Sequence, residues 1–115
     1  MIRATILITK KNMTSSHDDK ITIRQSDESC DLYTVAYHTP DVRSDRQFTT
    51  TEARVQQYLE DVLDSLICDT DPFEHVQVYT AIHPSVIYHV SDLESTVMRR
   101  RILNQIRDAL RFDVA

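Results

Sequence analysis

The sequence predicts one small α+β domain over residues 1–115, in which a two-layer, largely antiparallel sheet of about five strands carries two amphipathic helices on one face. Three observations predict this fold class. A chain of 115 residues is long enough for a single hydrophobic core. Short segments alternate apolar and polar side chains, as strands with one buried face do, and two longer segments show helical spacing behind capping residues. The order strand, strand, strand, helix, strand, strand, helix suits two layers.

The segment 2–9 is predicted to be the first strand, since its apolar and polar side chains alternate with a period of two. Residues 10–20 are polar, lack an apolar period and are expected to form a connection. Residues 21–25 and 32–38 are predicted to form a hairpin around a polar loop at 26–31. The register that collects most large apolar side chains on one face pairs Ile21 with Tyr37, Ile23 with Val35 and Gln25 with Tyr33.

A first helix is predicted after a polar loop that starts at Pro40 and runs to Arg46. Pro40 ends the preceding strand because proline has no amide proton for a sheet ladder. Thr49 and Glu52 form a capping box sequence, and Pro72 closes the helix together with the polar residues before it. The apolar residues at helical spacing are Val55, Tyr58, Leu59, Val62, Leu63, Leu66 and Ile67.

The C-terminal part of the chain is predicted to form a second hairpin and a second helix. Residues 76–80 and 86–90 pair around a turn at His83 and Pro84, in a register that joins Val76 to Val90, Val78 to Tyr88 and Thr80 to Val86. Ser91 and Glu94 then repeat the capping box. The apolar stripe of the second helix consists of Val97, Met98, Ile102, Ile106, Ala109 and Leu110.

The composition excludes several classes of site. There is no glycine, so a phosphate-cradling loop or a dinucleotide fingerprint of the usual kind is excluded, because both need glycine for tight turns and close backbone approach. The net charge of −5 disfavours nonspecific binding of nucleic acid, which requires concentrated lysine and arginine. The charge is uneven, because residues 26–91 hold three basic and twelve acidic side chains, whereas residues 1–25 hold five basic and two acidic ones.

The sequence also predicts a cytoplasmic location without membrane contact. The apolar run at the N-terminus is too short for a signal peptide, and no apolar stretch approaches the length of a membrane span. Cys30 and Cys68 are the only cysteines, and two cysteines without a secretory signal are more typical of free thiols in a reducing compartment than of a structural disulfide.

No catalytic, cofactor or metal site is expected from residue spacing. The five histidines do not occur at a recognised metal-ligand spacing, and the closest carboxylates are typical of a solvated helix face and a turn. The cysteines have no local signature of a nucleophile, and Cys68 fits a partly buried apolar position. The residues considered are His17, His38, His75, His83, His89, Asp61, Asp64, Asp69, Asp71, Cys30 and Cys68.

Two surfaces are candidates for interaction. Tyr79, Ile87 and His89 are predicted to share the sheet face opposite the helices, where an exposed aromatic and apolar patch favours a protein partner. The alternative is that loops or the N-terminal segment cover this patch. The second helix carries Arg100, Arg107 and Arg111 on one face, where they suit phosphates, carboxylates or an acidic surface such as the first helix.

Three functional hypotheses follow. The leading one is a non-catalytic binding or assembly module that acts through protein contacts at an exposed sheet face or strand edge, with a homodimer as the expected form. The second is a nucleic-acid-binding accessory protein that uses the arginines of the last helix. The third is a small hydrolase that depends on histidine and aspartate side chains brought together by the fold.

Overall fold

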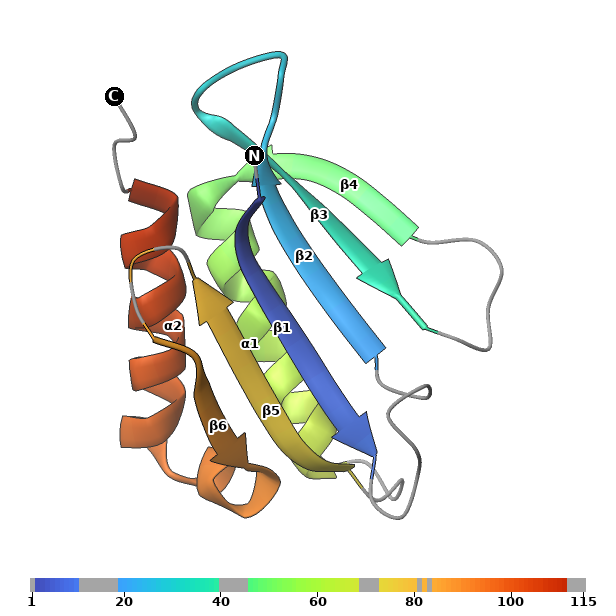
Figure 1. Cartoon of the computed structure of the whole chain (residues 1–115), viewed down its shortest axis with the longest axis vertical. Coiled ribbons are helices and arrows are strands. Elements are labelled where there is room, and N and C mark those ends of the chain that lie inside the picture. The colour runs from blue at the N-terminus through green and yellow to red at the C-terminus, as the bar shows by residue number, and fades with distance from the viewer. Residues whose placement is uncertain are drawn as a thin grey trace.

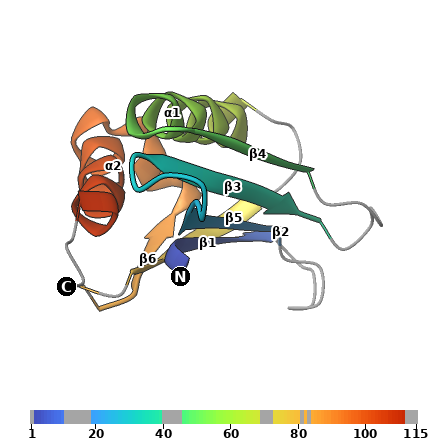
Figure 2. The same ribbon diagram turned by 90° about the horizontal axis from the view of Figure 1, so that it is seen from above.

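The computed structural model describes residues 2–10, 19–39, 46–68, 73–80, 82 and 84–111. They form one six-stranded antiparallel sheet with two α-helices on the same face (Figures 1 and 2). The α+β class, the antiparallel sheet and the two helices on one face are therefore confirmed.

The elements follow one another in the order β-β-β-β-α-β-β-α, with a short 3₁₀ helix before the last α-helix. The strands lie in the order β4-β3-β2-β1-β5-β6, so β4 and β6 are the two edges of the sheet. The bounds are β1 (Ile2–Lys10), β2 (Asp19–Gln25), β3 (Leu32–His38), β4 (Arg46–Thr51), α1 (Glu52–Cys68), β5 (Phe73–Thr80), β6 (Val86–His89), η2 (Val90–Glu94) and α2 (Thr96–Arg111).

The sixth strand, β4, was not expected from the sequence. Thr49 was predicted to cap α1, but it lies in β4 opposite Thr34 of β3, and α1 begins at Glu52 directly after the strand. The prediction was wrong because, among the described strands, β4 pairs with β3 alone and most of its side chains are exposed, so no apolar alternation marks it. Its β-branched threonines nevertheless favour an extended backbone.

The β2–β3 hairpin has the predicted register, in which Ile21, Ile23 and Gln25 lie opposite Tyr37, Val35 and Tyr33. Serine side chains support its turn in the absence of glycine. Ser26 Oγ accepts a hydrogen bond from the amide of Glu28 at 3.1 Å, and Ser29 Oγ accepts one from the amide of Asp31 at 3.2 Å. Such hydrogen bonds from backbone amides to nearby serine hydroxyl groups stabilise a turn without glycine.

The register of the β5–β6 hairpin differs from the predicted one by two residues. Val76 lies opposite Tyr88 rather than Val90, and Val78 lies opposite Val86. A two-residue shift keeps every side chain on its own face, so apolar alternation cannot distinguish the two registers. The prediction was therefore right about the faces and wrong about the partners.

The chain between β6 and α2 also starts its turn earlier than predicted. The capping box is made by His89 and Asp92 at the start of η2, whereas the sequence placed it at Ser91 and Glu94. Leu93 of η2 is fully buried, which anchors this turn to the core. The helix α2 then begins at Thr96.

The core lies between the sheet and the two helices. Strands β1, β2, β3, β5 and β6 contribute alternate side chains to it, and α1 and α2 contribute their apolar faces. Val97 was predicted to belong to the stripe of α2 but is 67% exposed, because the buried stripe follows residues 102, 106, 109 and 110. The largest fully buried side chains are Ile8, Ile21, Ile23, Leu59, Leu93, Ile102, Ile106, Val35, Val55, Val76 and Val78.

Two tyrosines join the sheet to α2 through their hydroxyl groups. Tyr33 donates a hydrogen bond to the carbonyl of Leu110 at 2.8 Å, and Tyr88 donates one to Oε1 of Gln105 at 2.7 Å. Both rings are buried, so these bonds satisfy polar atoms that would otherwise be shielded from water. Burial also raises the pKa of each tyrosine.

Tyr37 makes a comparable contact within the sheet. Its hydroxyl donates a hydrogen bond to Oδ2 of the buried Asp19 at 2.9 Å. Burial of Tyr37 and this bond to the carboxylate both disfavour the phenolate, and they raise the pKa of Tyr37 far above its usual value of about 10.

We expect side chains on the two faces of β2 to contribute very differently to the free energy of unfolding. Ile23→Ala should lower the free energy of unfolding by about 2–5 kcal/mol, because it removes a fully buried side chain and leaves a cavity. Thr22→Ala, on the opposite face of the same strand, should lower it by less than about 1 kcal/mol. Urea unfolding of both variants measures this difference, and similar losses would contradict the assigned faces.

Tyr37 predicts a stability loss at alkaline pH. Because its pKa is raised in the folded chain, unfolded Tyr37 ionises first as the pH rises above about 10, and the free energy of unfolding falls. Between that pH and the raised folded pKa, wild type should lose about 1.4 kcal/mol per pH unit more than Tyr37→Phe. Urea unfolding from pH 8 upward compares the two slopes, and equal slopes would rule out this coupling.

Candidate functional site: the open face of the sheet

The two helices lie on one side of the sheet and leave its other side uncovered (Figure 2). In Figure 1 the strands pass in front of α1, so the viewer looks onto this uncovered side, which we call the open face. The strand residues that alternate with the buried ones form it. They include Thr5, Leu7, Thr9, Lys20, Thr22, Arg24, Thr34, Ala36, His38, Gln47, Thr49, His75, Gln77, Tyr79, Ile87 and His89.

Apolar side chains gather on the β1, β5 and β6 part of the open face. Leu7 of β1 and Ile87 of β6 flank Gln77 of β5 in one row, and Tyr79 follows two residues along β5. Ile87 is 61% exposed and Tyr79 is 38% exposed. The register therefore places Tyr79, Ile87 and His89 on one face, as the sequence predicts. The described residues do not cover this patch.

The open face is also poor in charge. Among the sixteen residues named above, only Lys20 and Arg24 carry a formal charge and none is acidic, although 27% of the whole chain is charged. The centres of protein interfaces are depleted in charged side chains in the same way. A surface of this composition favours contact with another protein over simple solvation.

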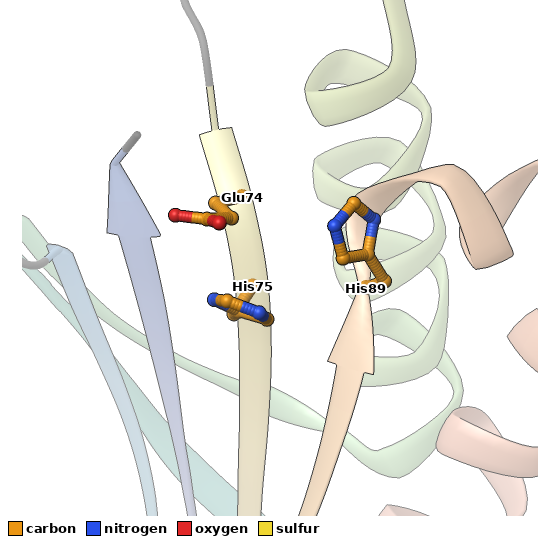
Figure 3. Close-up of side chains that lie close together, drawn as sticks. All are labelled: Glu74, His75 and His89. Carbon is orange, nitrogen blue, oxygen red and sulfur yellow. The ribbon is translucent and has the colours of Figure 1, made fainter. Parts of the chain in front are cut away.

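Two histidines meet at one end of this face, where the sequence alone gave no sign of them. The observed register places His75 of β5 opposite His89 of β6, with ring centroids 5.4 Å apart at an interplanar angle of 84° (Figure 3). The predicted register would have separated them. Glu74 lies beside His75, and one ligand atom from each of the three side chains lies within 4.8 Å of the others.

The ring of His89 is positioned by η2. Its Nδ1 lies 2.9 Å from Oγ of Ser91, and the amide of His89 donates to Oδ2 of Asp92 at 3.3 Å. Serine, histidine and aspartate are therefore close in space, but Asp92 bonds the backbone of His89 rather than its ring. The arrangement is that of a helix cap, and it does not form a catalytic triad.

The arginines of α2 are partly engaged within the chain. Arg99 pairs with Asp64 of α1, and Arg111 Nε lies 2.7 Å from Oε1 of Glu52, also on α1. Arg107 lies 3.8 Å from Asp108 of its own helix, while Arg100 is exposed. Of the three arginines predicted to share a face, Arg111 therefore docks on the acidic first helix, and Arg99 does so as well.

The remaining candidates do not assemble into a reactive group among the described residues. Asp61 accepts a hydrogen bond from Gln57 at 3.1 Å on the exposed side of α1. Cys30 is an exposed free thiol in the β2–β3 turn. His38 is exposed on β3, which lies three strands from β5 and its His75. His17, His83, Asp69 and Asp71 lie outside the described residues.

No known protein family, no curated protein and no solved structure matches the chain. Within the described residues, no helix combines the length and the apolar character that crossing a membrane requires. The function is therefore inferred from the open face itself.

Proposed function

We propose that the chain is a non-catalytic binding and assembly module that forms a symmetric homodimer through its open face. The observation that carries this proposal is the uncovered patch of Leu7, Tyr79 and Ile87 on a sheet face almost free of charge. Large exposed apolar groups on a regular surface are typical of interfaces. The cytoplasmic location predicted from the cysteines is part of this proposal.

The size of the open face supports a second copy as the occupant. Six strands about 4.8 Å apart and about 20 Å long present roughly 600 Å² of flat area, before side-chain relief is added. A standard interface buries about 800 Å² of accessible surface on each partner. One sheet stacked on another therefore gives an interface of the usual size, with the spacing of a β-sandwich.

The pattern of side chains on the open face also suits two-fold symmetry. A two-fold axis that lies in the interface beside Gln77 would set Tyr79 against the partner's Ile87, since these residues are on adjacent strands about equally far from Gln77. Lys20 and Arg24 lie on β2, two strands from Gln77, and Lys20 is opposite Leu7. Tyr79 and Ile87 of the two copies then meet near the axis, while the long side chains of Lys20 and Arg24 can extend their charged ends away from it.

A matched pair of lysine substitutions tests this interface. Ile87→Lys should weaken dimerisation by more than about 30-fold, because it buries a charge at the centre of the contact. Val97→Lys is the control, since Val97 is 67% exposed on α2 and Ile87 is 61% exposed on β6. Analytical ultracentrifugation of wild type and both variants measures the association constant.

The expected order is a dimer for wild type and Val97→Lys, and a monomer for Ile87→Lys. Wild type that stays monomeric at about 100 μM would contradict the proposal. A dimer that Ile87→Lys leaves intact would reject the open face and direct attention to the sheet edges, of which β4 is one among the described strands.

A further inference from the structure

We propose that Glu74, His75 and His89 form a binding site for one divalent transition-metal ion, with zinc as the best-fitting ion. The three side chains offer two imidazole nitrogens and one carboxylate oxygen within 4.8 Å of one another (Figure 3). The site lies within a single chain at one end of the open face, so it does not depend on the proposed dimer.

The register of the sheet builds the histidine pair. His75 and His89 lie directly opposite each other on β5 and β6, and side chains in such positions have Cβ atoms about 4.5–5.5 Å apart. The pair therefore rests on paired backbone strands rather than on loops. Metal ligands held on regular elements are preorganised, which lowers the cost of gathering them.

An irregularity in β5 brings the carboxylate to the same place. Thr9 of β1 lies opposite His75, but the next residue, Lys10, lies opposite Phe73, so Glu74 is an extra residue without a partner on β1. A bulge of this kind interrupts the alternation of side chains and redirects one of them. It explains how Glu74 and His75, which are adjacent in sequence, present their ligand atoms together.

The contacts of His89 leave one ring nitrogen for a metal. Its Nδ1 accepts a hydrogen bond from the amide of Ser91 at 3.4 Å and lies 2.9 Å from Oγ of Ser91, so Nδ1 is held in the η2 cap and Nε2 is left for a metal. Binding through Nε2 requires the ring proton to move to Nδ1, which then donates to Oγ of Ser91. Metal-binding histidines usually hold their second nitrogen in such a hydrogen bond, which fixes the tautomer and the ring orientation. Ser91 thus has the position of an outer-shell partner.

The ligand set selects zinc over hard cations. Zinc binds imidazole and carboxylate groups in tetrahedral sites, often with three protein ligands and one water. Calcium and magnesium prefer several oxygen ligands, whereas this site offers one carboxylate. Bond lengths of about 2.0–2.1 Å place tetrahedral ligand atoms about 3.4 Å apart. The ligand atoms must therefore approach from within 4.8 Å to about 3.4 Å of one another. Side-chain rotation allows this approach, because Glu74 and His75 are only half-buried and His89 is exposed, so neighbouring atoms do not lock them in place.

Isothermal titration of the tag-free, chelator-treated full chain with zinc chloride tests the site. Wild type should bind one equivalent, and Glu74→Gln, His75→Gln and His89→Gln should each weaken binding by more than about 10-fold. His38→Gln and Cys30→Ser are matched controls, since they remove an exposed histidine on the same face and an exposed thiol. Both should bind zinc as wild type does.

Titration with cobalt chloride gives an independent measurement. Wild type and the controls should develop the visible absorption of tetrahedral Co²⁺ with nitrogen and oxygen ligands, and His75→Gln should lose it. His75→Gln leaves the η2 cap intact, so it keeps the test valid even if His89→Gln does not fold, which far-UV circular dichroism reports. Absence of zinc binding by wild type at about 100 μM, or unchanged binding by His75→Gln, would overturn the proposal.

Discussion

Burial of alternate side chains beneath two helices is the constraint on which the other features of this protein depend. Ile8, Ile21 and Ile23 have no exposed surface, and they fix which side of β1 and β2 faces α1 and α2. A shift of one residue in the pairing register would move all the side chains of a strand to the opposite faces. The other face, with Leu7, Tyr79 and Ile87, is thereby left without a covering layer in the described part of the chain.

The same constraint explains how much of the fold the sequence could predict. Ile21, Ile23 and their partners on β3 alternate strongly enough to specify both faces and the register of the first hairpin. The edge strand β4 could not be predicted, because its sequence shows no alternation of apolar and polar side chains and most of its side chains are exposed. Its threonines also fit a helix cap. At Thr49 the strand propensity of threonine competes with its tendency to cap a helix, and Thr49 lies in a strand because it pairs with Thr34 of β3.

The candidate sites were predictable to different degrees for a related reason. Tyr79, Ile87 and His89 share a face in either register of the second hairpin, so the apolar patch could be found from alternation. The pairing of His75 with His89 depends on the register itself, and the position of Glu74 depends on a bulge in β5. Neither leaves a trace in apolar periodicity, which is why residue spacing predicted no metal site.

The central claim is that the open face is the surface at which this chain meets a second copy. Methyl NMR with a soluble paramagnetic agent tests it most directly, since relaxation of each methyl group reports its access to solvent. In the concentrated protein, the methyls of Leu7 and Ile87 should be protected while those of Val97 on α2 remain accessible. Equal relaxation of the Ile87 and Val97 methyls at every protein concentration would contradict the account.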